Sequence, residues 1–406
     1  MTTIKDGVHD HIEVRGVARA LLDTPAVQRL RRIRQLGTVE LVYPSANHTR
    51  FEHSVGVYHL AERAIAGLDV HDREAARVRA AAILHDVGHA PYSHNVEGVI
   101  HRHTGKYHDD VAGLLGDGSV ADVLAAHDLD PGDVAALIRG EGELGQLVSG
   151  ELDVDRMDYL VRDAHHTGAP YGIIDHERLL RELTFVDGDL VLDEGNVQAA
   201  ESLLLARALM HPTVYTHKTA RIGKVLLRRA TDRLIEEAGV DAPTVRRMDD
   251  YELFVALREH DATAAFARRL DARDLYKRAV WAEIDGVPAD VIDADHADVR
   301  AFERAIADRA GVPERAVLVD VPDRPSMAES TSRVVVNGEV RRLVEQSRLV
   351  EALLEVQSDQ WRLGVYAPGD AVDVVGTAAE SVLGLDVDAL VSEVRTGRFA
   401  TLDEFE

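Results

Sequence analysis

The stretch "ILHDVGHAPYSH" (residues 83–94) ends an alanine-rich apolar run with four polar groups, His85, Asp86, His89 and His94. Apolar residues at three- and four-residue intervals predict a helix over 72–89, closed by Gly88 and Pro91. Burial of imidazole and carboxylate groups is unfavourable unless each finds a partner. Successive helical residues point about 100° apart, so one cation beside the helix end can face both His85 and Asp86.

The composition predicts a cytoplasmic protein of two domains. The chain has 406 residues, 46% of them hydrophobic, which is enough for a large core. Cysteine is absent, which excludes disulfides and thiolate metal sites and fits an intracellular location. We find neither a signal-peptide pattern nor an apolar run of about 18–20 residues, so we expect no membrane partner.

The charge balance restricts the possible ligands. There are 71 acidic and 46 basic residues, a net charge of −25, and only five of the basic residues are lysine. This pattern is typical of an acidic, halophilic proteome, and equally of an ordinary acidic protein from a GC-rich genome. Such a chain repels polyanions, which argues against nucleic acid as a partner. A phosphate-binding pocket would therefore need its own local cations.

Helical periodicity dominates the first 240 residues, and a mixed pattern follows. We predict a mostly α fold, with a helical catalytic domain over 1–285 (core 23–240) and a C-terminal α+β module over 286–406. Helices are expected at 17–37 (broken at Thr24-Pro25), 54–68, 72–89, 149–166, 197–237 (interrupted at Pro212), 301–311 and 347–360. Strands are expected at 315–322 and 361–368. Asp-Gly and Asn-Gly turns predict hairpins at 183–193 and 332–343.

Histidine is concentrated in the helical part, where 18 of the 20 histidines precede residue 218. His53, His85, Asp86 and Asp155 would each project from a predicted helix. Two imidazoles and two carboxylates suit a divalent cation such as Mn, Fe, Ni or Mg, and an octahedral ion would keep two positions open. A His-Asp dipeptide alone is common by chance, so the prediction depends on the other two residues.

Five longer motifs carry a family resemblance. They are "DTPAVQRLRRIRQLG" (23–37), "YPSANHTRFEHSVGVYHL" (43–60), "LHDVGHAPYSHNVEG" (84–98), "LDVDRMDYLVRDAHHTG" (152–168) and "VYTHK" (214–218). In this order they resemble the HD phosphohydrolase superfamily, and in particular its deoxynucleoside triphosphate triphosphohydrolases of the sterile-alpha-motif-and-HD type with their bacterial relatives. The resemblance covers roughly residues 6–280, and we expect no sterile-alpha-motif domain.

The resemblance implies roles for the polar residues. His53, His85, Asp86 and Asp155 would hold one divalent metal ion, which would activate water for attack on the α-phosphate. A second catalytic group would consist of His89, His94, Glu97 and His108. His94 and Glu97 would form an imidazole–carboxylate pair that protonates the leaving oxygen, and this chain has Glu97 where the family commonly has aspartate.

The resemblance also implies a nucleotide pocket. Arginines would clamp the triphosphate, and a tyrosine under the sugar would exclude a 2′-hydroxyl; these substrate residues would be Gln35, Arg50, Arg156, Tyr159, Asp163, Arg207 and Tyr215. Tyr159 and Asp163 follow Asp155 at i+4 and i+8 and so share its helix face. On an uninterrupted helix, Arg207 and Lys218 would lie within about 20° of one another.

Five further residues match a regulatory nucleotide site of the family. They are Asp23, Gln28, Arg31, Arg178 and Lys218, and the resemblance implies Mg-bound GTP or dGTP between the subunits of a homo-oligomer (dimer or tetramer). We therefore predict metal-dependent hydrolysis of deoxynucleoside triphosphates to deoxynucleoside and inorganic triphosphate, activated by guanine nucleotide. The alternatives are an HD phosphohydrolase acting on another nucleotide or phosphate ester, and a non-catalytic nucleotide sensor.

Overall fold

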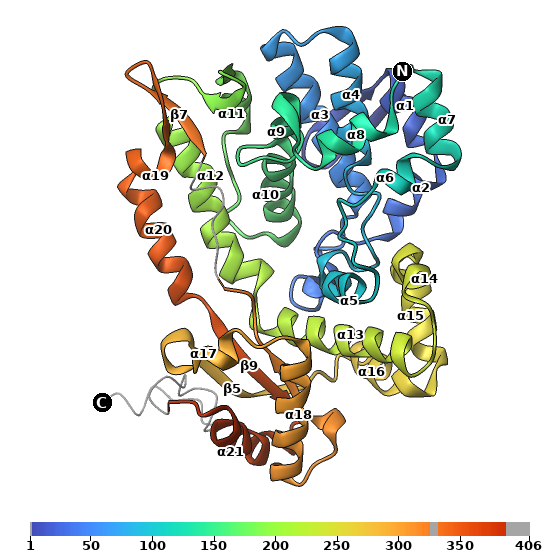
Figure 1. The fold of residues 1–406 in the computed structure, drawn as a ribbon, viewed down its shortest axis with the longest axis vertical. Helices are drawn as coiled ribbons and strands as arrows, with labels where there is room; N and C mark the ends of the chain where they lie inside the picture. The colour runs from blue at the N-terminus through green and yellow to red at the C-terminus, as the bar shows by residue number, and fades with distance from the viewer. Residues whose placement is uncertain (1, 325–331, 387–406) are drawn as a thin grey trace. The chain divides into compact units, whose positions relative to one another are not determined.

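Helices form most of the chain, with three small sheets among them (Figure 1). The computed structural model describes residues 2–324 and 332–386. The predicted fold class, mostly α with a small α+β module, is confirmed. Within the described residues, no helix combines the length and the apolar composition that a membrane crossing requires.

The chain divides into two compact units. The first comprises Met1–Ala267 and Ala328–Leu353, and the second comprises Arg268–Met327 and Leu354–Glu406, as far as these ranges are described. The sequence places a boundary at 285–286 instead, and that boundary stays a prediction about folding domains. The candidate site lies wholly in the first unit.

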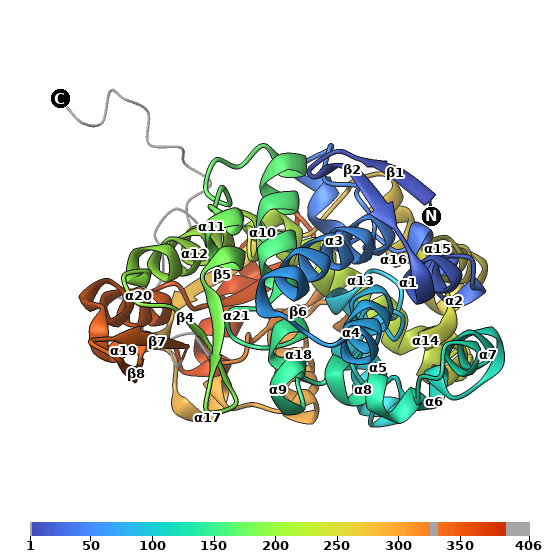
Figure 2. The same cartoon turned by 90° about the horizontal axis from the view of Figure 1, so that it is seen from above.

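The first unit opens with an antiparallel hairpin that the sequence analysis did not predict. Its strands are β1 (Thr2–Asp6) and β2 (Asp10–Val14), and it lies beside α3 (Arg50–Leu68), as Figure 2 shows. The predicted helix break is confirmed, because α1 (Gly16–Leu22) ends before Thr24 and α2 (Pro25–Arg29) begins with the proline at its first position. Proline is tolerated there because that backbone N–H has no helical partner.

Three helices carry the centre of this unit: α3, α4 (Asp72–Leu84) and α10 (Val154–Thr167). Helix α3 begins with a capping box in which Thr49 and Glu52 satisfy each other's backbone groups, and this places His53 in the first turn. Helix α4 ends at Leu84, so the prediction of a helix to residue 89 is wrong. Gly88, in the turn that follows, allows a close approach of the chain, since a Cβ there would lie 2.0 Å from the carbonyl oxygen of His108.

The predicted interruption at Pro212 is confirmed. Helix α12 (Val197–Met210) passes into a π-helical turn, η3 (His211–Tyr215), before α13 (Lys218–Glu236) begins. Proline lacks the N–H that continues the α-helical ladder, and the wider turn accommodates that loss. The inference that Arg207 and Lys218 share one helix face is wrong, because it assumed an uninterrupted helix.

Both predicted hairpins are present, and together they form one sheet. The first consists of β3 (Leu183–Val186) and β4 (Asp189–Leu192), and the second of β7 (Arg333–Val336) and β8 (Glu339–Arg342). Strand β4 pairs in parallel with β7, giving the order β3-β4-β7-β8. The 333–342 hairpin, which the sequence analysis grouped with the C-terminal module, therefore belongs to the first unit.

The second unit is a three-stranded sheet with helices packed against it. Its strands β5 (Lys277–Glu283), β9 (Arg362–Ala367) and β6 (Leu318–Asp320) are all antiparallel, in that order. Helices α18 (His296–Ala310) and α21 (Val372–Leu383) contact this sheet and each other.

The remaining α-helices of the described residues, in both units, are α5 (His94–Thr104), α6 (Ala112–Leu115), α7 (Gly118–Ala126), α8 (Pro131–Ile138), α9 (Gly142–Val148), α11 (His176–Arg181), α14 (Ala242–Arg247), α15 (Asp250–Glu259), α16 (Asp261–Asp271), α17 (Ala289–Ile292), α19 (Leu343–Gln346) and α20 (Arg348–Asp359).

Candidate metal centre and catalytic cavity

A cavity of about 470 Å³ lies among α3, α5, α10, α12, α13 and the turn that follows α4. Its walls contain most of the residues that the sequence analysis selects for binding and catalysis: Gln35, Arg50, His85, Asp86, His89, His94, His108, Asp155, Tyr159, Asp163, Arg207 and Tyr215. His53 and Glu97 are not among the lining residues, but each is within hydrogen-bonding distance of one, Asp155 and His94 respectively. The turn after α4, α3 and α10 thus bring together residues that are far apart in sequence.

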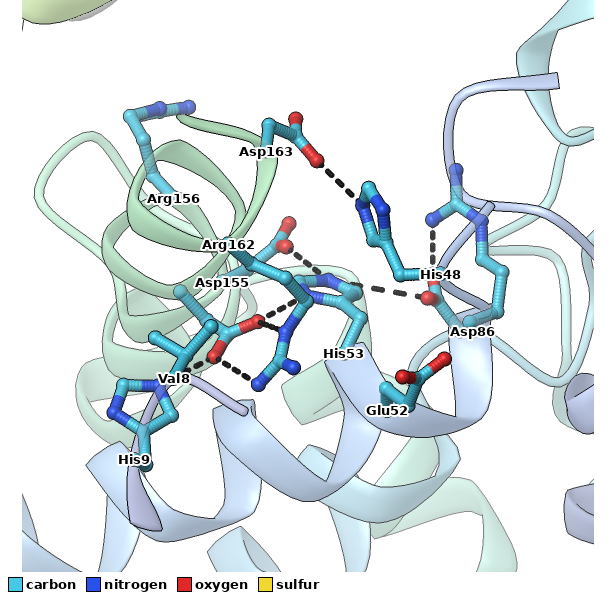
Figure 3. A network of polar contacts seen from close by, with 12 residues as sticks. Val8, His9, His48, Glu52, His53, Asp86, Asp155, Arg156, Arg162 and Asp163 are labelled. Atoms are coloured by element: carbon cyan, nitrogen blue, oxygen red, sulfur yellow. Dashed lines mark hydrogen bonds and ion pairs between the residues drawn. The ribbon is translucent and has the colours of Figure 1, made fainter. Parts of the chain in front are cut away.

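The four predicted metal ligands lie together, and Figure 3 shows His53, Asp86 and Asp155 of this set. The Nε2 atoms of His53 and His85 are 3.3 Å apart, and Asp155 Oδ1 lies 2.8 Å and 3.9 Å from them. Asp86 Oδ2 is 3.9 Å from His53 Nε2, and it is buried without a hydrogen-bond partner among the described residues. Neighbouring donors around an ion with bonds of about 2.1 Å lie about 3 Å apart. Atoms of His53, His85 and Asp86 all lie within 4.8 Å of one another and fit a divalent cation, and Asp155 lies beside the two imidazoles.

A hydrogen bond to Nδ1 of each imidazole orients its Nε2 toward the space between the donor atoms. His85 Nδ1 is 2.9 Å from the carbonyl oxygen of Ala82, which can only accept, so Nδ1 carries the proton. His53 Nδ1 is 2.8 Å from Asp158 Oδ2. When Nδ1–H donates to such a partner, the neutral imidazole presents a lone pair at Nε2, which is the arrangement of metal-binding histidines.

The electrostatics of the centre favour a positive charge. Burial opposes the charged form of His53, but hydrogen bonds with Asp155 and Asp158 raise its pKa to about 10. Burial likewise opposes ionisation of Asp86, yet Arg50, His85 and His89 hold its pKa well below the usual range. Asp86 is therefore ionised at neutral pH, and a cation bound at this point would take the place of the proton on His53 Nε2.

Glu97 joins two imidazoles of the second catalytic group. Its Oε2 is 2.7 Å from His94 Nδ1, and its Oε1 is 2.5 Å from His108 Nδ1. The His89 ring stacks on His108 with centroids 4.2 Å apart. Despite burial, these contacts hold the pKa of Glu97 well below its usual range. Desolvation by the cavity walls lowers the pKa of His94, whereas Glu97 overcomes desolvation at His108 and raises its pKa. An additional proton shared among His94, Glu97 and His108 is therefore more stable on His108 than on His94.

A second polar group lies across the cavity on α10. Asp163 Oδ1 is 2.8 Å from His48 Nε2, and Asp163 Oδ2 accepts a hydrogen bond of 2.9 Å from the Tyr215 hydroxyl. The rings of Tyr159 and Tyr215 meet edge to face, with centroids 6.2 Å apart. This corner presents a fixed carboxylate beside two aromatic rings, a combination that suits a sugar hydroxyl and the apolar face of its ring.

Two of the three arginines predicted to bind phosphate line the cavity, and the third does not. Arg50 and Arg207 line the cavity, and Arg50 donates to Asp86 Oδ1 and Ser93 Oγ, both at 2.8 Å. Arg156 does not line the cavity. Its guanidinium donates to the carbonyl oxygens of Gly150 and Glu151, and Figure 3 shows it directed away from His53 and Asp86.

The predicted regulatory residues lie outside this cavity, among α1, α2, α11 and the start of α13. Asp23 pairs with Arg19, and the Gln28 side-chain oxygen accepts from Arg31, whose guanidinium covers the ring of Phe51. Arg178 donates to Asn196 Oδ1, and Lys218 is the exposed first residue of α13. Their role in nucleotide binding stays a prediction.

The residues that line or support the cavity and were not predicted from sequence include His48, Asp158, His211 and Lys224. Asp158 had a detectable signal, since it follows Asp155 at i+3 and precedes Arg162 at i+4 on the same helix. Lys224 had none, because its position depends on how the π-helical turn redirects α13.

Gly56 permits the close packing behind His53. It lies three residues after His53 on α3, and a Cβ there would be 1.9 Å from Asp158 Oδ1 and 2.4 Å from Arg162 Nη2. We predict that Gly56→Ala disrupts this buried ion pair and destabilises the protein by about 3 kcal/mol or more, the typical loss when a buried pair is broken. Thermal unfolding measures the loss.

Gly67 provides the matched control on the same helix. It is exposed, and a Cβ there would meet only the carbonyl oxygen of Leu180 at 3.9 Å. Gly67→Ala should leave the melting temperature unchanged or raise it, because alanine favours helix over glycine by about 1 kcal/mol. Equal melting temperatures for the two variants would contradict the packing argument.

Two family descriptions match the chain and cover most of it. The HD domain matches residues 50–163, which include the metal-centre residues, and the HD associated region matches residues 174–393. An uncharacterized protein of Methanocaldococcus jannaschii is 33% identical over 383 residues, which cover 92% of this chain and 80% of that protein.

Two other proteins connect this sequence to named activities. The deoxynucleoside triphosphate triphosphohydrolase SAMHD1 homolog of Dictyostelium discoideum is 32% identical over 243 residues, and the match covers 54% of this chain but only 46% of that protein. The crystal structure of a phosphohydrolase from Bacteroides thetaiotaomicron superposes with a TM-score of 0.73 at 25% identity, over 91% of this chain and all of that one.

Proposed function

This chain belongs to the HD-domain family of phosphohydrolases, and from that premise we propose that it hydrolyses deoxynucleoside triphosphates to deoxynucleoside and inorganic triphosphate. The observation that carries the proposal is the content of one cavity. Its walls combine the donor set for a divalent cation, the cations Arg207 and Lys224, and the Asp163–Tyr215 corner. These groups match, in order, the reacting phosphate, the remaining phosphates and the sugar.

Cationic side chains in the cavity allow an anionic ligand to bind although the chain has a net charge of −25. Arg50, Arg207 and Lys224 all line the cavity, so a polyphosphate meets positive groups there although the chain as a whole repels anions. Guanidinium groups also bind phosphate oxygens through two parallel hydrogen bonds. A triphosphate uses this set more fully than a monophosphate would.

Different residues of the cavity would bind the metal ion and supply the proton. A divalent cation held by His53, His85, Asp86 and Asp155 would supply a Lewis acid and a water of lowered pKa. Hydrolysis breaks the bond between the 5′-oxygen and the α-phosphorus, so the water oxygen ends on the triphosphate and the 5′-oxygen must gain a proton. The trio of His94, Glu97 and His108 holds that proton beside the donor set, and the raised pKa of His108 keeps it available near neutral pH.

The position of Arg50 favours a single cation over two. Its guanidinium donates to Asp86 Oδ1, so Oδ2 is the oxygen of this carboxylate that lacks a hydrogen-bond partner among the described residues. A two-metal centre would normally use such a carboxylate to bridge the ions. This argues against a second cation bridged through Asp86, although His89, His94, Glu97 and His108 also lie close enough together to hold one.

Product analysis tests the proposal. The purified protein is incubated with Mn²⁺ and each deoxynucleoside triphosphate, with and without GTP, and the phosphorus-containing products are separated. We expect inorganic triphosphate and deoxynucleoside as the first products. Pyrophosphate or orthophosphate as the first product would contradict it. Rates that GTP does not change would overturn only the predicted activation.

His211 leads to a prediction about pH. Burial and the neighbouring Arg207, Lys224 and Arg221 lower the pKa of His211 to about 4, so it is neutral at pH 7 in the free protein. A bound triphosphate would offset these positive charges and raise that pKa. The bound state then holds more protons, so affinity should increase as pH falls from 7 toward 5, by at most about tenfold per unit for one proton.

Inorganic triphosphate is a suitable probe for this effect, because it is the expected product and is not turned over further. Titration calorimetry across this pH range should give a steeper pH dependence for the wild type than for His211→Gln. Protonation of the triphosphate itself changes the affinity of both proteins equally, so the difference between their pH dependences reports His211 alone. Parallel pH dependences would show that His211 takes up no proton.

A further inference from the structure

The N-terminal hairpin β1–β2 reaches the back of the metal centre through an unbroken series of polar contacts. Figure 3 shows His9 of this hairpin and Arg162 beside His53. Asp6, the last residue of β1, accepts two hydrogen bonds from Arg162, at 2.8 Å and 3.2 Å. Arg162 donates in turn to both oxygens of Asp158, at 2.8 Å and 3.0 Å. The series ends on His53, whose Nδ1 is 2.8 Å from Asp158 Oδ2.

His9 makes a second connection from the same hairpin. Its Nε2 is 2.7 Å from Asp158 Oδ1, so the carboxylate that orients His53 is held by the hairpin directly and through Arg162. Asp6 also shapes the hairpin turn, because its Oδ1 accepts from the backbone N–H groups of Val8 and His9 at 2.9 Å and 2.8 Å. One carboxylate therefore forms the turn and fixes Arg162.

These contacts are buried, and the hairpin itself is packed. His53, Asp158 and Arg162 are each 0% exposed, and Asp6 is 6% exposed. Ile12 and Val14 of β2 are also fully buried. A buried charge that loses one partner is strongly unfavourable. If the hairpin detached, Arg162 would lose Asp6 and Asp158 would lose His9, so the orientation of His53 would no longer be fixed.

We infer that the hairpin Thr2–Val14 is part of the metal-binding apparatus, with Asp6 and His9 acting as positioning residues for His53 through Arg162 and Asp158. The inference rests on the proposed function only for the assignment of His53 as a metal ligand. Because coupling between two binding events is reciprocal, a metal ion at His53 must also stabilise the docked hairpin.

Hydrogen exchange on the wild-type protein tests this coupling without any substitution. Amide exchange is followed by mass spectrometry for peptides covering residues 2–14, with Mn²⁺ and after chelation. We expect exchange there to slow by about tenfold or more when Mn²⁺ is present. Unchanged exchange in the hairpin, with protection confined to the ligand-bearing helices, would overturn the inference.

Asp6→Asn tests the same coupling through metal affinity. Asparagine keeps the oxygen that accepts from Val8 and His9 but removes the charge that holds Arg162. Loss of a group that contacts a metal ligand directly, as Asp158 contacts His53, typically weakens metal binding 10–100-fold. Asp6 acts through Arg162 and Asp158, so we expect Mn²⁺ affinity to fall by about tenfold, the lower end of that range, in calorimetric titration. The visible spectrum of the Co²⁺ form should also shift, because it reports the geometry of the ligands and not the stability of the fold.

Asp10→Asn is the matched control in the same hairpin. The Asp10 side chain is 68% exposed and contacts only Lys5 and His11 among the described residues. It should bind Mn²⁺ within about twofold of wild type. Wild-type affinity and Co²⁺ spectrum for Asp6→Asn would overturn the inference, and if that variant does not fold, the exchange experiment decides. Neither measurement uses turnover, so an enzyme with another substrate would leave both results unchanged.

Discussion

The double substitution His85→Ala/Asp86→Ala will remove bound metal and hydrolytic activity together. His85 Nε2 and the buried Asp86 Oδ2 are two of the four proposed donors, and alanine can replace neither. Asp86 also holds Arg50 through a 2.8 Å hydrogen bond, so its loss disturbs a residue that we propose binds the phosphates. We expect Mn²⁺ content near zero and turnover reduced by at least about 1,000-fold, because the remaining donors cannot hold a Lewis acid.

The chain offers a control with the same dipeptide. His71 and Asp72 stand at the opposite end of α4, where both are exposed. His71→Ala/Asp72→Ala removes the same atoms from the same helix and should keep full metal content and activity, with a stability loss of about 1 kcal/mol or less from the helix dipole. Metal measured by mass spectrometry and turnover measured on the same samples check both variants. Retained turnover in His85→Ala/Asp86→Ala would show that these residues do not hold a catalytic metal.

This pair of dipeptides shows where sequence reasoning is strong. One His-Asp pair stands at each end of α4, and only the second follows an apolar run, which is why the sequence predicts it to be buried and functional. Other local signals were equally reliable: Pro25 starts α2, Pro212 interrupts the long helix, and the Asp-Gly and Asn-Gly turns form hairpins. Each of these features depends on the backbone chemistry of a few neighbouring residues.

The features that sequence reasoning missed depend on contacts between distant segments. Arg156 follows the ligand Asp155, yet it is drawn to the carbonyl oxygens of the preceding loop and leaves the cavity. Lys224 enters the cavity only because a π-helical turn redirects α13. His48 becomes informative only when α10 brings Asp163 within 2.8 Å of it. The spacing of residues along the chain does not predict such contacts between distant segments.

Glu97→Gln will separate proton transfer from metal binding. The Glu97 carboxylate accepts from His94 and His108 at once, and it raises the pKa of His108 against desolvation. An amide of the same size cannot accept from both imidazoles through two oxygens, so the trio should lose its extra proton at neutral pH. We expect metal content to stay at the wild-type level while kcat falls by about 100-fold or more, the usual contribution of a positioned acid.

The pH profile of kcat gives the sharper test of the same substitution. In the wild type, the raised pKa of His108 keeps the proton donor charged to higher pH, and activity is lost as pH rises through that pKa. Without the carboxylate the pKa of His108 falls, so the alkaline limb of the profile should move to lower pH. Glu143→Gln, the same change at an exposed position on α9, should keep both the rate and the profile. A Glu97→Gln variant with reduced kcat but an unshifted alkaline limb would mean that Glu97 only orders the α5 segment and holds no proton donor.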